Sequence, residues 1–223
     1  MADTKIALVT GASRGIGQAI AAALTAQGMT VVAATRADLD VTDDASVGRA
    51  AADVTNRYGR LDVLVNNAGI SGGQAGQSPG AVDLAVVRAV YETNLFGVLR
   101  VTEAFLPLLR RSPDPRIINI SSGTASLHWN TDPAHAFAAG GTPVAYPTSK
   151  AALNMLTVQY AKALPDFSVN AVAPGACGTD FAKDLGLSLD RTAAEGAAIA
   201  VRLATMDNPP TGAFLQDDGP VPW

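Results

Sequence analysis

Near its start the chain carries the segment Lys5-Ile-Ala-Leu-Val-Thr-Gly-Ala-Ser-Arg-Gly-Ile-Gly17. Residues 5–10 form an apolar run of the kind that is buried on both faces of a parallel sheet. The glycines that follow end this run, and Ile16, Ile20 and Leu24 then recur at helical spacing. The segment therefore predicts a buried strand, a glycine-rich turn and a helix, in that order.

The glycine-rich turn has the composition of a dinucleotide-binding loop. Glycines let the backbone approach a pyrophosphate closely, and the following helix N-terminus offers free N–H groups and a partial positive charge. A turn that binds nothing is the plainer interpretation. The position of this turn, between a buried strand and a helix, favours dinucleotide binding.

Strands and helices alternate along the rest of the chain. Further strands are expected at residues 30–35, 61–65, 116–120, 167–172 and 212–215, and helices from Thr42, at 83–111, at 146–164 and at 192–204. This alternation predicts an α/β fold, a Rossmann-type doubly wound parallel sheet with helices on both faces. Residues 1–223 are expected to form a single domain that binds NAD(P).

Composition narrows the range of partners and compartments. Hydrophobic residues make up 48% of the chain, whereas charged residues make up 16% and the net charge is −4, which argues against nucleic-acid and membrane-surface binding. No apolar run approaches the ~18 residues of a membrane span. With Cys177 as the only cysteine, the sequence predicts a cytoplasmic protein. His128 and His135 lack metal-ligand spacing, so no metal is expected.

Asn66-Asn-Ala-Gly69 follows the strand at residues 61–65. Ligands of open α/β sheets bind beyond the carboxyl ends of the strands, so this turn is expected beside the glycine-rich turn. Asparagine and glycine also end strands for purely structural reasons. Both roles are expected here, shaping the turn and lying along the cofactor.

Tyr146-Pro-Thr-Ser-Lys150 places a tyrosine and a lysine on one face of a helix. An ammonium beside a phenol favours the phenolate, which would let the tyrosine give and take a proton near neutral pH. Alone, such a pair is typical of a solvated helix face. Its context is Asn94 and the serine pair Ser121-Ser122, since a hydroxyl can polarise a carbonyl and an amide can position a water. Alternate strand residues face opposite sides, so only one serine should face the substrate.

Together these segments resemble, in order and over nearly the whole chain, the motif set of the short-chain dehydrogenase/reductase family. Asn170-Ala-Val-Ala-Pro-Gly175 and Thr179 match the family segment that flanks the nicotinamide. The resemblance implies a catalytic tetrad of Asn94, Ser122, Tyr146 and Lys150. In this tetrad, the resemblance implies that Tyr146 donates or accepts the proton and that Lys150 lowers the tyrosine pKa and binds the nicotinamide ribose. Ser122 would orient the carbonyl, and Asn94 would hold the water of a proton relay. The implied cofactor contacts, apart from Arg36, are Gly11, Ser13, Arg14, Gly15, Ile16, Gly17, Asp40, Val41, Asn67, Ala68, Gly69, Tyr146, Lys150, Pro174, Gly175 and Thr179; Asp40 matches the adenine-contacting position.

The second strand also bears on the choice of cofactor. An acidic residue there usually marks NAD, because it binds the ribose diol. Here the strand ends in Thr35-Arg36 and Arg14 lies in the glycine-rich turn, so two guanidinium groups suit a 2′-phosphate, unless both are ordinary surface arginines. NADP (NADPH) is favoured over NAD. We expect an NADP-dependent oxidoreductase that interconverts a carbonyl and an alcohol. The alternative is a non-catalytic NADP-binding regulatory protein, which would have no need of the Tyr146/Lys150 pair.

The segment between Ser122 and Tyr146 is longer than in many members and resembles the carbonyl-reductase-like branch, where an insertion covers a surface used for oligomerisation. Monomer and homodimer therefore both stay open. The expected pocket wall has few charges, so a small apolar carbonyl or alcohol is expected as substrate; its residues are Trp129, Phe137, Phe181 and Leu185.

One stretch departs from the family pattern. Parallel neighbouring strands need a connection of at least ~10–12 residues, yet only a few separate the strand at 30–35 from Asp40. Either the crossover helix is absent and residues 37–41 form no parallel strand beside 30–35, or the chain joins two segments across a hidden gap. In the first case the adenine end of the cofactor site would be open and cofactor affinity would suffer.

Overall fold

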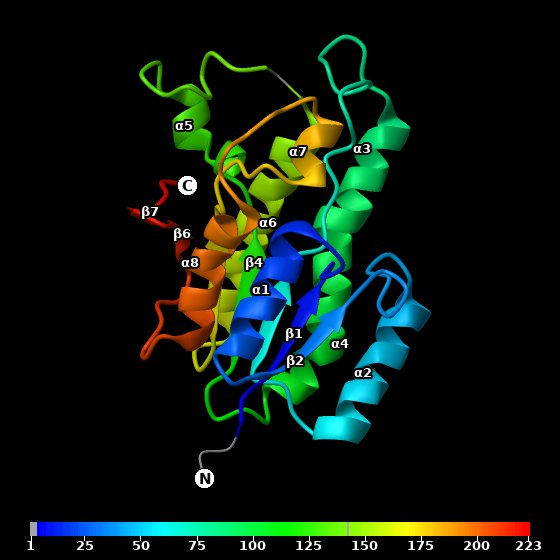
Figure 1. Ribbon diagram of the computed structural model, residues 1–223. Coiled ribbons are helices and arrows are strands. Elements are labelled where there is room, and N and C mark those ends of the chain that lie inside the picture. Colours follow the sequence, from blue (N-terminus) through cyan, green and yellow to red (C-terminus); the bar gives the residue numbers. More distant parts are fainter. Residues whose placement is uncertain (1–3, 142) are drawn as a thin grey trace.

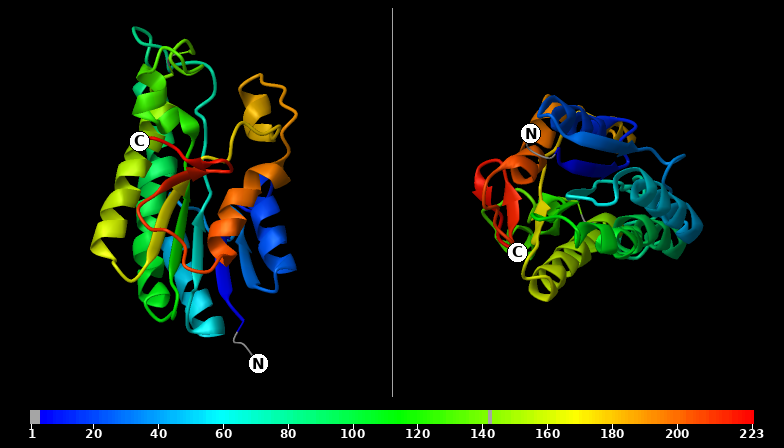
Figure 2. Two further views of the ribbon diagram at one scale, coloured as in Figure 1. Left: turned by 90° about the vertical axis from the view of Figure 1, so that its left-hand side faces the viewer. Right: turned by 90° about the horizontal axis from the view of Figure 1, so that it is seen from below.

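The computed structural model describes residues 4–141 and 143–223. In these residues seven strands form one sheet, in the order β2-β1-β3-β4-β5-β6-β7, with helices on both faces (Figures 1 and 2). All neighbouring strands pair in parallel except β7, which is antiparallel to β6. The predicted Rossmann-type doubly wound fold is confirmed.

The strands lie close to their expected positions, with one short addition at the end. Their bounds are β1 Ile6–Thr10, β2 Thr30–Ala34, β3 Val63–Asn66, β4 Arg116–Ile120, β5 Ser168–Val172, β6 Phe214–Gln216 and β7 Gly219–Pro220. The helices are α1 Gly15–Ala26, α2 Asp44–Tyr58, α3 Leu84–Tyr91, α4 Gly97–Leu109, α5 Leu127–Thr131, α6 Ala145–Ala163, α7 Asp180–Asp184 and α8 Ala193–Thr205. A 3₁₀ turn spans Gly123–Ala125, and a π-helical turn spans Glu92–Phe96.

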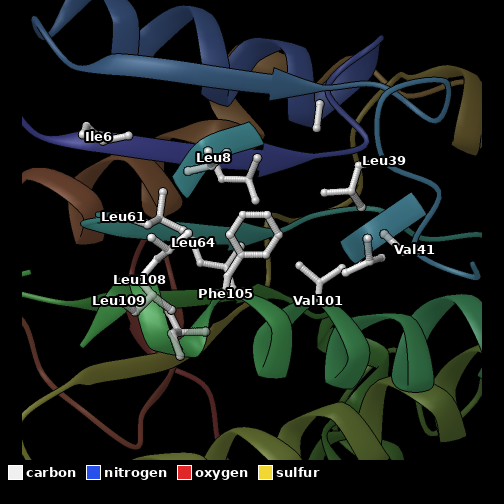
Figure 3. Packing of buried hydrophobic residues seen from close by; sticks show 14 of the residues in the cluster. Ile6, Leu8, Leu39, Val41, Leu61, Leu64, Val101, Phe105, Leu108 and Leu109 are labelled. Carbon is white, nitrogen blue, oxygen red and sulfur yellow. The ribbon is translucent and has the colours of Figure 1, made fainter. Parts of the chain in front are cut away.

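Two hydrophobic cores cover the two faces of the sheet, because successive strand residues point to opposite sides. In β1, Ile6 and Leu8 join the core under α2 and α4, which also holds Phe105 (Figure 3). Ala7 and Val9 join the core under α1 and α8. The strand is fully buried, as its continuous apolar run predicts.

The connection between β2 and α2 is short. Residues 35–43 form turns rather than a helix or strand. The amides of Asp38 and Leu39 donate to the carbonyl of Thr35 at 3.1 and 2.9 Å, so the chain folds back on itself at once. In this chain residues 37–41 form no strand beside β2, no crossover helix follows β2, and β2 is an edge strand.

The short connection still fills the core. Leu39 and Val41 are 2% and 7% exposed and point toward Val101 and Phe105 of α4 (Figure 3). Along the outer side of β2 a groove of about 490 Å³ lies between this strand and α2. The sheet therefore ends at β2 with an open edge. Leu39 and Val41 of the connection are nevertheless buried in the core.

The prediction of one uninterrupted helix at residues 83–111 is wrong in one respect. A π-helical turn, Glu92–Phe96, separates α3 from α4 and contains the buried Asn94. The π-helical turn adds a residue to the helix without breaking its course, and such turns are frequent at functional sites. Apolar spacing does not reveal it, because α3 and α4 each keep an ordinary helical pattern. No helix in the described part of the chain is long and apolar enough to cross a membrane.

Candidate active site

The carboxyl ends of the parallel strands bring the predicted motifs to one edge of the sheet. The turn after β1, the turn after β3, the segment after β4 and the segment after β5 all emerge there, below α5 and α7 (Figure 1). The amide of Asn67 and that of Ala68 donate to Oγ1 of Thr10 at 3.0 and 3.1 Å, which joins the first two turns.

The glycine-rich turn and the Asn66–Gly69 turn are packed against each other. Gly11 has φ +65°, and a Cβ there would lie 2.9 Å from Cα of Ala68. Nδ2 of Asn67 donates to the carbonyl of Thr10 at 2.8 Å, and a Cβ on Gly17 would overlap this amide. Asn67 therefore holds the loop in shape, as its structural interpretation predicts, while the glycines keep the backbone accessible.

Tyr146 lies in the first turn of α6, next to Ser122 at the end of β4. The Ser122 hydroxyl lies close enough to the phenol of Tyr146 to act on its pKa, and it hydrogen-bonds the hydroxyl of Thr124 at 2.9 Å. Ser121 instead turns inward, where its Oγ donates to Oδ1 of Asn154 at 2.7 Å. The two serines thus face opposite sides, and the structure places Ser122, as expected, toward the site.

Burial governs the acid–base state of the tyrosine and lysine. Lys150 is 4% exposed, and its Nζ donates to the carbonyl of Ile120 at 2.7 Å while lying 5.8 Å from the Tyr146 ring centre. Burial lowers the pKa of Lys150 to about 8 and raises the pKa of Tyr146 to about 12, although the nearby Ser122 hydroxyl acts to lower the latter. Desolvation therefore sets the direction for the free protein, and the expected lowering of the tyrosine pKa by Lys150 stays a prediction.

The Asn94 side chain makes three hydrogen bonds that link separate segments of the site. Its Nδ2 donates to the carbonyl of Ile70 at 2.9 Å and to Oγ of Ser149 at 3.1 Å. Its Oδ1 accepts from the amide of Ile70 at 2.9 Å. The side chain therefore joins the loop after β3 to α6, and its expected role in holding a water stays a prediction.

Both arginines that are expected at the cofactor phosphate are paired with carboxylates. Arg14 contacts Asp180 at 3.1 Å, and Arg36, whose side chain is 85% exposed, contacts Asp40 at 3.0 Å. Hydrogen bonds from Thr42 and the Arg36 ion pair hold the pKa of Asp40 below its usual value. The two guanidinium groups remain at the surface, where a phosphate can compete for them.

Val41 lies in the core rather than in the cofactor cleft. A Cβ on Gly97 would lie 2.8 Å from its Cγ2, and its carbonyl accepts a hydrogen bond from Arg100 at 2.6 Å. The Val41 side chain thus packs against α4, and a cofactor contact of this residue stays a prediction. Ile16 packs partly into the core under α1 and α8.

The segment after β5 folds back over the glycine-rich turn. Gly15 lies beside Thr179, where a Cβ on Gly15 would be 3.5 Å from Cγ2 of the threonine. Arg191, which the sequence did not single out, anchors this segment by donating to the carbonyl of Pro174 at 3.0 Å and by pairing with Asp217. Nothing in the residue pattern predicts this role, since the contact depends on how the chain folds back after α7.

Aromatic side chains line the edge of the site. Phe181 packs on Tyr146 with ring centres 5.3 Å apart. Trp129 stacks on His135 at 4.6 Å and also meets Phe137, and both Trp129 and Phe137 lie against Gly123, the residue after Ser122. Three of the four expected wall residues thus lie beside Ser122 or Tyr146, whereas Leu185 follows α7.

Comparison with known proteins identifies the class that this fold and this cluster of side chains define. The family model for short chain dehydrogenase matches residues 5–39 and 34–189, two segments that meet at the short connection after β2. The chain belongs to this family of oxidoreductases. Short-chain dehydrogenase anuI of Penicillium roqueforti is 35% identical over 92% of this chain and 90% of its own length. Salutaridine reductase of Papaver bracteatum is 31% identical, over 94% and 93% respectively.

Among solved structures, an NADPH-bound carbonyl reductase from chicken fatty liver superimposes with a TM-score of 0.82 at 28% identity, covering 99% of both chains. The alignment with salutaridine reductase spans 293 positions, more than the 223 residues of this chain, so that relative carries segments absent here.

Proposed function

We propose that the protein is an NADP-dependent oxidoreductase that reduces a small apolar carbonyl compound to an alcohol, or runs the reverse reaction. The observation that carries the proposal is the junction of Tyr146, Ser122 and Lys150 beside a glycine-rich turn at the same sheet edge. A non-catalytic NADP-binding regulator would not need a half-buried tyrosine beside a serine and a lysine at this place.

The residues present fit a nicotinamide dinucleotide. Gly11 and Gly15 adopt positive φ, and α1 begins at Gly15 without a capping bond from the Arg14 side chain, so the helix N-terminus can receive a pyrophosphate. The cofactor would be held by this turn, by Asn67–Gly69, by Lys150 and by the Pro174–Thr179 segment. When bound, it supplies the hydride.

We infer that the bound cofactor carries a 2′-phosphate and is therefore NADP. Arg14 and Arg36 stand near the end of β1 and of β2, and an exposed carboxylate partner can be displaced by a phosphate because surface ion pairs are weak. The absence of a strand beyond β2 leaves the adenine end open, so the adenosine half should contribute less to affinity than it does in relatives with the full crossover.

Each side chain of the site then has a task in the reaction. Tyr146, with a pKa of about 12, holds its proton at neutral pH and donates it to the carbonyl oxygen. Ser122 orients that oxygen by a hydrogen bond. Lys150, whose ammonium is poorly solvated, would bind the nicotinamide ribose and stabilise the phenolate that remains. Asn94 keeps the loop after β3 in place against α6.

The aromatic wall suits an apolar substrate. Phe181 covers Tyr146, and Trp129 and Phe137 cover the segment after Ser122. Salutaridine reductase, (−)-isopiperitenone reductase and (+)-neomenthol dehydrogenase are among its relatives, and their names describe reductases and dehydrogenases.

A substrate screen tests the proposal. NADPH oxidation is followed by absorbance against cyclic ketones, aromatic ketones, aldehydes and anionic keto acids, and each active compound is repeated with NADH. We expect turnover with apolar ketones or aldehydes and a preference for NADPH. Tight NADPH binding without turnover of any carbonyl or alcohol would support the regulator instead.

A further inference from the structure

Gln77 lies in the loop between β3 and α3 and is buried although it is polar, with 3% of its surface exposed. Its Nε2 donates to the carbonyl of Ser71 at 3.0 Å and to that of Gly73 at 2.5 Å. Its Oε1 accepts from the amide of Tyr146 at 3.3 Å, and its backbone carbonyl accepts from the amide of Val144 at 2.9 Å. One side chain thus links this loop to the residue that carries the phenol.

The amide has only one orientation that satisfies its neighbours. Nε2 faces two carbonyl oxygens and Oε1 faces an N–H group, so exchanging the two atoms would set an acceptor against two acceptors and a donor against a donor. The fit is specific to glutamine. A glutamate at this position would match it only when protonated, and a leucine would satisfy none of these groups.

Gln77 also completes the start of α6. The first N–H groups of a helix lack partners within the helix, and Val144 at the N-cap makes no side-chain capping bond. Gln77 supplies an acceptor to Val144 and another to Tyr146. A capping group that is distant in sequence thereby fixes where the helix begins, and so where the tyrosine stands.

These contacts close a ring of hydrogen bonds around Tyr146. Asn94 binds both backbone groups of Ile70, which lies in the same loop as Gln77. Asn94 also donates to Oγ of Ser149, which in turn donates to the carbonyl of Tyr146 at 2.7 Å. Gln77 accepts a hydrogen bond from the amide of Tyr146, and Ser149 donates one to its carbonyl. Both backbone groups of the tyrosine therefore have side-chain partners.

We propose that Gln77 is a positioning residue for the reaction: it fixes the backbone of Tyr146 so that the phenol can reach the carbonyl oxygen that Ser122 orients. The inference rests on the proposed function of Tyr146 as proton donor. A misplacement of about 1 Å can lower a rate by two orders of magnitude, so loosening this contact should affect kcat much more than cofactor binding.

Three variants test it: Gln77→Leu, Gln77→Glu, and Gln74→Leu as the matched control, since Gln74 is an exposed glutamine on the same loop. With the best substrate of the screen, Gln77→Leu should lower kcat by at least about tenfold and leave the NADPH dissociation constant within about twofold. Gln74→Leu should change neither. Melting temperatures measured in parallel establish that each variant is folded at the assay temperature.

Gln77→Glu adds a readout that simple loosening of the fold would not give. A protonated carboxyl supplies one donor and one acceptor and so imitates the amide, whereas the carboxylate repels the carbonyls of Ser71 and Gly73. The ratio of its kcat to that of the native enzyme should therefore fall as pH rises through the pKa of the new carboxyl, which burial raises. The ratio for Gln77→Leu should stay low and constant.

Amide hydrogen exchange of the peptide that contains Tyr146 separates this inference from the proposed function. Faster exchange in Gln77→Leu, with Gln74→Leu unchanged, supports the contact even if the native protein reduces no carbonyl, in which case only the proposed function fails. The inference is overturned if Gln77→Leu keeps native kcat, if its loss appears mainly in NADPH affinity, if the Gln77→Glu ratio is independent of pH, or if exchange at Tyr146 is unchanged.

Discussion

Lys150 is a buried cation whose ammonium donates to the carbonyl of Ile120. Burial lowers its pKa from 10.5 to about 8, so between these values the unfolded chain binds a proton that the folded chain does not. Stability must then rise with pH across this window, by roughly 3 kcal/mol if the full shift is expressed.

The comparison with Lys150→Met measures this effect. Denaturant unfolding of both proteins from about pH 7 to about pH 10 should show the native protein gaining stability relative to the variant as pH rises. Below about pH 8 the difference should be constant. A difference that does not change between pH 8 and 10 would mean that Lys150 is better solvated than its 4% exposure indicates.

Arg36 is the residue through which cofactor choice can be changed. Arg36→Asp replaces a phosphate partner with a carboxylate beside Asp40, so it should repel a 2′-phosphate and accept a ribose diol. The ratio of kcat/KM for NADPH to that for NADH should fall at least about tenfold, which corresponds to about 1.4 kcal/mol. As a control, Arg110→Asp makes the same charge change at the C-terminal end of α4. It should leave the ratio of the two kcat/KM values unaltered. Equal ratios in all three proteins would show that Arg36 does not read the phosphate.

At the scale of elements, the connection after β2 shows how a shortened chain keeps its core. Leu39 is 2% exposed and packs with Val101 and Phe105, in a segment that is only a series of turns. Leu39→Ala should therefore lower the free energy of unfolding by about 2–5 kcal/mol, as for other buried leucines. The exposed Ala37→Gly change, two residues away, should cost less than about 1 kcal/mol. A loss below about 0.5 kcal/mol for Leu39→Ala would mean that the connection does not pack as described.

The sequence predicts the elements well where local chemistry determines them. The strand at residues 5–10, the loop glycines and the Tyr146/Lys150 pair each follow from residue type and spacing, and the absence of a crossover follows from chain length alone. The π-helical turn at Asn94 does not, because it shifts the helix register without changing the apolar pattern. Nor do the anchoring contacts of Gln77 and Arg191, which depend on which loops meet in space.

Over the whole molecule, the site arises because four loops leave the sheet at one edge and are tied together by side chains from distant segments. Thr10 joins the first two loops, Asn94 and Gln77 join the loop after β3 to α6, and Arg191 holds the segment after β5. The pKa of Tyr146 also depends on contacts between segments that are distant in the sequence. Spacing to Lys150 predicts a lowered value, but the packing of the folded chain raises it.

The most direct test of the account is the kinetics of Tyr146→Phe, which removes one hydroxyl and keeps the ring that packs on Phe181. We expect kcat for carbonyl reduction to fall by about two to four orders of magnitude, the usual contribution of a general acid, while the NADPH dissociation constant stays within about twofold. Retention of more than about a tenth of the native kcat, with NADPH still bound, would show that another group supplies the proton and that Tyr146 is not the centre of this site.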